Sequence, residues 1–372
     1  MSEVIYYSSD EAGAPSLNNA AGSLVAVLDA CLINGFNQKN VTALSVSSGV
    51  ATATISAHGY LTNRKVVIAG AATTAINGLK KVTVVDANTI SFDATGVADG
   101  VISGTITAKR APLGWSKAFS GTNQAMYQRT DPAATGSLLR IDDSAGGVHA
   151  NAIMVETATG INTYTNNTNN YTWAKGANSA SPQNWILVGD STAFHLFCDS
   201  TTSAGANGMR AYTFGDLVSY RAGDAYCSII GGSDADDTLL LWFRTADWRV
   251  PSNALFVQRP ASQFGGFQTV SVIGAPTDGT FTPFGGGTSG PTYPSSVDGG
   301  LIFQGNTIVY DGVSIRGYVK GLKEPLAIVP SFMHKAEMTG IHGTTSTYLI
   351  VMIKGANSTQ GAVAIDITGP WI

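Results

Sequence analysis

Charged side chains are scarce in this chain. Its 372 residues include 21 Lys and Arg and 25 Asp and Glu, which is 12% of the total, and the formal net charge is −4. The basic residues are scattered rather than clustered, so no long-range attraction to nucleic acid is expected. At the same time 44% of the residues are hydrophobic, which excludes an intrinsically disordered chain. We therefore expect a folded protein that does not bind DNA or RNA.

Cysteine and long apolar runs are also nearly absent. The three cysteines, Cys31, Cys198 and Cys227, lie far apart, which excludes a disulfide framework and fits synthesis in a reducing compartment. The longest apolar runs, such as Tyr348 to Ile353, are far too short to span a bilayer, and the first fifteen residues do not resemble a signal peptide. We expect no membrane span and no signal-directed export.

Glycine and small polar residues take the place of charge. The chain contains 43 Gly, and Ala, Ser, Thr, Asn and Val are abundant, a composition typical of short strands joined by tight turns. One helix is predicted within residues 18–33, where Leu24, Val27, Leu28, Cys31 and Leu32 form an apolar stripe. Asn18 or Asn19 would cap its start, and Asn34-Gly35 would end it. No βαβ pattern follows, so antiparallel pairing is expected.

The region from Val41 to Ala108 has the pattern of a small, separate β unit. Short strand candidates alternate there with turn signals such as Ser48-Gly49 and Asn77-Gly78. The fold class predicted is mainly β, with antiparallel β-sandwich or barrel domains, one N-terminal amphipathic helix and this inserted β domain. The predicted divisions are an arm and helix at 1–40, the inserted domain at 41–108, the main β domain at 109–260, a Gly/Pro-rich arm at 261–300, and strands at 301–372 that complete the parent domain.

The motifs of enzymes and cofactor sites are missing or out of context. No nucleophile elbow and no phosphate-binding lysine loop occurs, and the glycines at 285, 287 and 290 lack the strand and helix of a dinucleotide site. His195 and Cys198 would point to opposite faces of a strand, which disfavours a shared metal. Asp234, Asp236 and Asp237 lack the glycine and distal glutamate of a calcium loop. We predict no catalytic residues, no metal and no cofactor.

Aromatic residues give the one binding feature. Tyr164, Tyr171, Trp173 and Trp185 are interspersed with asparagines in TYTNNTNNYTWAKGANSASPQNW. Flat rings together with amide groups suit contact with sugars or protein surfaces, although the same residues also anchor loops onto sheet edges. These four residues are predicted to contact a partner or receptor.

Several segments resemble virion proteins encoded among the tail genes of long-tailed phages and prophages. They are APSLNNAAGSLVAVLDACLINGFNQKNVT, APLGWSKAFSGTNQAMYQRTDP, AYTFGDLVSYRAGDAY and VAIDITGPW, while the inserted unit resembles a β module that recurs in phage tail proteins. The resemblance implies a place in the virion tail, at the tip or baseplate, after synthesis in the host cytoplasm. It carries no active site that maps onto this chain.

Three functions follow as hypotheses. The first is a non-enzymatic structural component that forms a homo-oligomer, a trimer or hexamer, with other tail or baseplate proteins as partners. The second is a tail-tip protein that recognises a surface glycan, a pilus or an outer-membrane protein. The third is a glycan-cleaving tail enzyme, because such chemistry needs only two suitably spaced acids.

Overall fold

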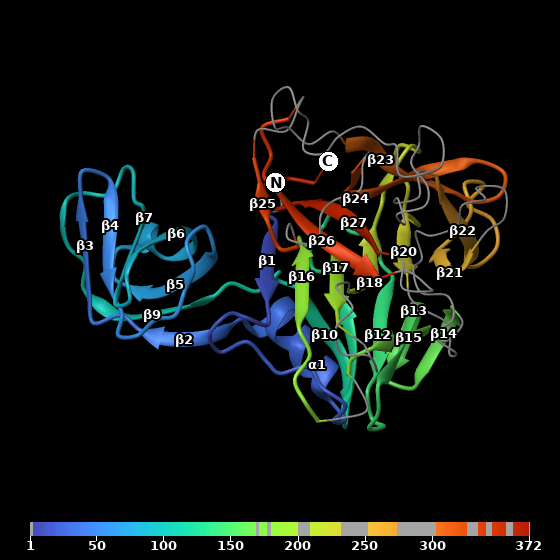
Figure 1. Cartoon of the computed structure of the whole chain (residues 1–372), viewed down its shortest axis with the longest axis horizontal. Coiled ribbons are helices and arrows are strands. Elements are labelled where there is room, and N and C mark those ends of the chain that lie inside the picture. Colours follow the sequence, from blue (N-terminus) through green and yellow to red (C-terminus); the bar gives the residue numbers. More distant parts are fainter. Residues whose placement is uncertain are drawn as a thin grey trace.

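A computed structural model of the chain describes residues 3–168, 171–176, 180–199, 209–231, 252–273, 303–325, 334–339, 344–354 and 360–371. The predicted fold class is confirmed: the described residues are mainly β, with a short helical segment near the N-terminus and a 3₁₀ turn at Thr74–Ile76 (Figure 1). Every pairing between named strands is antiparallel across these ranges. The predicted 261–300 arm lies mostly outside the described residues, as do Asp234, Asp236 and Asp237. No helix of the described residues is long and apolar enough to cross a membrane.

The largest sheet contains thirteen strands and runs through most of the parent domain. Its order is β1-β16-β17-β18-β20-β21-β22-β23-β24-β27-β26-β25, with β19 paired to β24. The strands are β1 (Ile5–Ser8), β16 (Trp185–Gly189), β17 (Ala193–Cys198), β18 (Arg210–Asp216), β19 (Val218–Ser219), β20 (Ser228–Gly231), β21 (Ser252–Val257), β22 (Gln268–Ile273), β23 (Phe303–Tyr310), β24 (Ile315–Pro325), β25 (Glu337–Met338), β26 (Tyr348–Lys354) and β27 (Gln360–Asp366).

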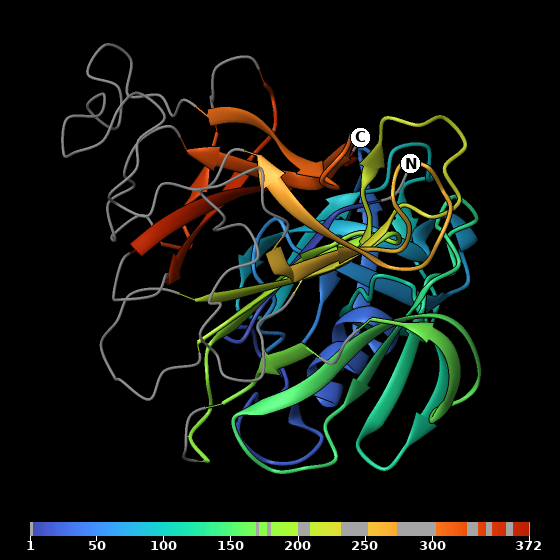
Figure 2. The same ribbon diagram turned by 90° about the vertical axis from the view of Figure 1, so that its right-hand side faces the viewer.

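A second sheet packs on one face of the large sheet and makes a sandwich (Figure 2). Its strands are β10 (Ser116–Gly121), β11 (Gln124–Gln128), β12 (Leu138–Asp142), β13 (His149–Gly160), β14 (Thr163–Asn167) and β15 (Tyr171–Ala174). The core between the sheets joins side chains of the helix, of this sheet and of β16 to β18. A separate core on the other face joins β16 and β17 to β26 and β27. Strands β16 and β17 are therefore buried on both faces.

The inserted unit, called the barrel below, is one eight-stranded sheet that curls around its own apolar core and projects from the parent domain (Figure 1). Its strands are β2 (Phe36–Asn40), β3 (Ala43–Ser47), β4 (Val50–Thr54), β5 (Lys65–Ala71), β6 (Gly78–Asp86), β7 (Thr89–Asp93), β8 (Gly100–Val101) and β9 (Gly104–Arg110). The strand order of this sheet is β2-β9-β5-β6-β7-β4-β3-β8, so β2 and β8 lie at its two ends. The expected unit 41–108 lies within these bounds, and the barrel has its own apolar core.

The helical segment is shorter than predicted and is capped differently. It consists of α1 (Ser23–Leu28), which continues as a π-helical turn over Asp29–Asn34. The Asn18 side chain accepts a hydrogen bond from the Ala20 amide and does not cap the helix. The free amide of Leu24 in the first turn donates instead to the carboxylate of Asp143, at 2.9 Å. Gly35 ends the segment as predicted, with a φ of 70°. A β-carbon at Gly35 would collide with the carbonyl oxygen of Arg110, so glycine lets the barrel strands meet there.

Candidate functional site

The predicted aromatic contact residues do not form one surface. Tyr171 and Trp173 on β15 and Trp185 on β16 are at most 2% exposed. The Trp173 ring stacks on Tyr212 of β18 with centroids 5.2 Å apart. The prediction is therefore wrong for these three residues: they pack inside the sandwich, where no partner reaches them. Tyr164 on β14 is half-buried, 5.6 Å from the Arg140 guanidinium, and its contact with a partner stays a prediction.

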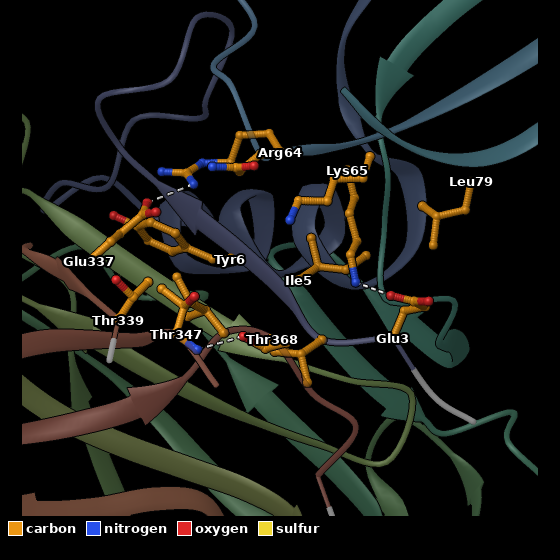
Figure 3. Close-up of a pocket in the computed structure, with 14 residues that line it drawn as sticks. Glu3, Ile5, Tyr6, Arg64, Lys65, Leu79, Glu337, Thr339, Thr347 and Thr368 are labelled. Atoms are coloured by element: carbon orange, nitrogen blue, oxygen red, sulfur yellow. Dashed lines mark hydrogen bonds and ion pairs between the residues drawn. The ribbon is translucent and has the colours of Figure 1, made fainter. Parts of the chain in front are cut away.

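A cleft at the junction of the barrel and the parent domain gathers polar groups instead (Figure 3). Its volume is about 510 Å³, within the range of ligand pockets, roughly 300–1,000 Å³. The barrel provides Arg64 and Lys65 at the start of β5, and Lys81 and Leu79 on β6. The parent domain provides residues of β1, β25 and the C-terminal segment, namely Glu3, Val4, Ile5, Tyr6, Glu337, Thr339, Thr347, Ile367 and Thr368.

Charge is divided between the two walls of the cleft. All three lining cations, Arg64, Lys65 and Lys81, belong to the barrel, whereas both lining acids, Glu3 and Glu337, belong to the parent domain. Two ion pairs cross from wall to wall: Lys65 with Glu3, and Arg64 Nη1 with Glu337 Oε1 at 3.0 Å. A ligand that enters the cleft thus meets cations on one side, and carboxylates and threonine hydroxyls on the other.

Arg64 is held rigidly within the cleft. Its guanidinium carbon lies 4.2 Å from the centre of the Tyr6 ring, a cation–π arrangement. Its Nε is 3.8 Å from Glu11 Oε1, and only 10% of the side chain is exposed. Burial raises the pKa of Tyr6 to about 12, against the opposing effect of the nearby Arg64. The phenol therefore stays neutral at physiological pH.

Lys65 and Lys81 occupy directly opposite positions on the antiparallel strands β5 and β6. Like charges in that register repel, so the pair destabilises the barrel. Glu3 pairs with Lys65 but is itself 58% exposed, which makes this ion pair weak. Lys81 is exposed and forms no ion pair in the described part of the chain. One positive charge on this wall is therefore not compensated.

Beneath the cleft, a buried ionic lock joins the barrel to the parent domain. Arg110, the last residue of β9, donates from Nε to Glu11 Oε2 at 2.5 Å and from Nη2 to the Tyr6 carbonyl at 2.6 Å. It also donates to the Lys65 carbonyl. The side chains of Arg110 and Glu11 are 1% and 2% exposed. Because one guanidinium binds both units at several points, the barrel is fixed in orientation.

Other reactive groups are isolated within structural surroundings. His195 Nε2 lies 2.9 Å from the Lys320 carbonyl and its ring packs on Trp371, whereas Cys198 Sγ faces the Ala174 carbonyl in the other core. The predicted opposite orientation of His195 and Cys198 is thus observed. Among the described residues, no three His, Cys, Asp or Glu side chains lie close enough to hold a metal ion.

The cleft was not predicted from the sequence. The adjacent cations Arg64 and Lys65 at a strand start, and Lys80 and Lys81 on the next strand, were the available signal. The register of β5 and β6 makes Lys65 and Lys81 neighbours, but the residues of the parent wall, such as Tyr6 and Thr368, are far from them in the sequence.

Comparison with known proteins gives little. No protein-family model and no curated protein matches the chain. Among solved structures it has a remote similarity to Phage phi92 endosialidase, at 11% sequence identity and a TM-score of 0.18, over 90% of this chain and 71% of that one. A likeness of this size carries no conclusion about fold or function.

Proposed function

We propose that the chain is a structural, non-enzymatic component of a phage tail, located in the tip or baseplate region. The support is the resemblance of its helix segment, its inserted β module and its C-terminal strand to tail-encoded virion proteins. The mainly β, antiparallel fold agrees with that assignment. Assembly as a homo-oligomer with other tail proteins as neighbours belongs to the same proposal.

The observation that carries the structural role is the locked junction. Arg110 and Glu11 are both almost fully buried, and the guanidinium binds two backbone carbonyls besides the carboxylate. Breaking such a pair leaves a buried charge without a partner, which costs about 3–5 kcal/mol. A barrel held in this way keeps one orientation, as a component of a repeating assembly requires.

Immunogold electron microscopy of particles produced by the strain that encodes the chain tests this proposal. With an antibody against the barrel, we expect label at the end of the tail remote from the head. Label on the head, or absence of the protein from purified particles, contradicts it. Incubation of the purified chain with host polysaccharide is expected to release no new reducing ends, and release of such ends contradicts the non-enzymatic role.

Receptor recognition by the projecting barrel is the second candidate, favoured by the barrel's position away from the body of the molecule (Figure 1). Phe36 and Arg110 are register partners, so residues 37–109 can be replaced by a short Gly-Ser turn. We expect particles with this replacement to assemble but to adsorb poorly to host cells. Normal adsorption by assembled particles rules out recognition by the barrel.

A further inference from the structure

We propose that the cleft between the barrel and the parent domain binds an acidic saccharide. Its carboxylate is held by Lys65 and Lys81, and its hydroxyl groups bond to Glu337 and to the threonines of the opposite wall. Figure 3 shows Lys65, Glu337 and these threonines around the cleft. This inference does not depend on a place in a virion, and it is tested on the purified chain.

The lysine pair supplies the anion-binding half of the site. Lys65 and Lys81 stand directly opposite each other in register, and both line the cleft. The Glu3 carboxylate that pairs with Lys65 is more than half exposed, so a ligand carboxylate can replace it at little cost. A carboxylate between the two ammonium groups removes their repulsion and forms charge-assisted hydrogen bonds. The same register that places two like charges side by side thus favours an anion bound between them.

Arg64 is not the anion-binding group, although it is the cation nearest the base of the cleft. Its charge is already neutralised by Glu337 at 3.0 Å and by the buried Glu11. Its stacking on Tyr6 fixes it further. Arg64 therefore acts as a positioning residue that orients Glu337, and the free positive charge stays with the lysines.

The opposite wall selects a hydroxylated ligand over a simple anion. Thr339, Thr347 and Thr368 line it together with Glu337, and the Thr347 amide donates to Thr368 Oγ1 at 2.7 Å. Hydroxyl and carboxylate oxygens on this wall accept hydrogen bonds from sugar hydroxyls. The exposed Leu79 side chain adds apolar surface for the C–H face of a sugar ring. An acidic peptide would use the lysines but has no hydroxyl pattern to match the threonines.

Isothermal titration calorimetry of the full chain tests the proposal at low salt. The probes are a tetrasaccharide that contains glucuronic acid, its neutral glucose counterpart, and a pentaglutamate peptide. We expect the acidic tetrasaccharide to bind at least about tenfold more tightly than either of the others, because charge-assisted hydrogen bonds are lost with the neutral sugar. Equal binding of the neutral sugar, tighter binding of the peptide, or no binding of the acidic sugar overturns the proposal.

The variants Lys81→Glu and Lys80→Gln separate binding from folding. Lys81→Glu places an acid opposite Lys65, so the melting temperature is expected to stay the same or rise while affinity for the acidic tetrasaccharide falls at least about tenfold. Lys80 is next in sequence but does not line the cleft, and Lys80→Gln is expected to leave affinity unchanged. Unchanged affinity in Lys81→Glu, or an equal loss in Lys80→Gln, contradicts the site.

Discussion

The inserted barrel and the parent domain bury their strands in different ways. In the barrel, β3 and β4 alternate strictly between exposed and buried residues, because one face of each strand meets the core and the other meets water. In the parent domain, β16 and β17 are buried at every position. The barrel completes its core within residues 36–110, whereas the parent strands need both the second sheet and the C-terminal strands to cover them.

The junction between these regions differs from both of them. Each region is stabilised mainly by apolar packing, while the contact between them combines the packing of Phe36 against Tyr7 with two ion pairs, Arg110–Glu11 and Arg64–Glu337. Apolar packing tolerates small shifts, but a buried ion pair with several hydrogen bonds favours one geometry. The two units therefore fold around separate cores, and the ionic contacts set their relative orientation.

The largest expected effect comes from breaking the lock. In Glu11→Ala the buried Arg110 loses its carboxylate, and the free energy of unfolding is expected to fall by about 3–5 kcal/mol. Urea denaturation followed by circular dichroism measures the loss. Glu3→Ala is the matched control, because its carboxylate is 58% exposed and its removal should cost no more than about 1 kcal/mol. Similar losses in both variants would show that the lock is not a buried pair.

A comparable loss is expected inside the parent core. Trp173→Ala removes a fully buried ring that stacks on Tyr212, at a cost of about 3–5 kcal/mol. Trp173→Phe is the control: the indole N–H has no acceptor among the described residues, so this smaller change should cost clearly less than Trp173→Ala. Stability is measured by the same denaturation experiment. A negligible loss in Trp173→Ala would restore the surface role predicted from the sequence.

This contrast explains what could be predicted from the sequence. Apolar and polar residues alternate within 43–54, which allowed these strands of the barrel to be predicted, and the glycines of the turns marked the strand ends. The Tyr171 to Trp185 segment was misread because its asparagines suggested an exposed loop, whereas burial from both sides is decided by strands far away in the chain. The predicted helix cap was wrong for the same reason, because the carboxylate that accepts the hydrogen bond of the Leu24 amide belongs to Asp143, 119 positions away.

A histidine in the parent core predicts a pH dependence of stability. Burial lowers the pKa of His195 from its usual 6.5 to about 4, partly opposed by its bond to the Lys320 carbonyl. In the unfolded chain the His195 imidazole therefore binds a proton as the pH falls through about 6.5, whereas in the folded chain it does so only near pH 4. The stability contributed by the neutral imidazole is complete above pH 6.5 and is lost as the pH falls toward 4, by up to about 3 kcal/mol.

Denaturation curves between pH 7 and pH 4.5 measure this dependence. His195→Gln keeps a donor for the Lys320 carbonyl but cannot titrate, so the slope of stability against pH should decrease in this variant. His149 and His334 also have pKa values lowered mainly by burial, and His149→Gln serves as the comparison. An unchanged slope in His195→Gln would mean that the imidazole is protonated within the folded core.

The smallest loss of stability is expected for Tyr164, the aromatic residue whose contact with a partner is still a prediction. Tyr164 is only half-buried on the outer strand β14, beside Arg140, so Tyr164→Ala should lower the free energy of unfolding by no more than about 1 kcal/mol. Trp173 lies about ten residues further along the chain and is fully buried. Comparing Tyr164→Ala with Trp173→Ala therefore tests whether Tyr164 belongs to the surface and Trp173 to the core. If Tyr164→Ala costs as much as Trp173→Ala, the ring anchors the sheet edge and is not available to a partner. A small loss of stability together with reduced adsorption of particles would identify Tyr164 as a contact residue.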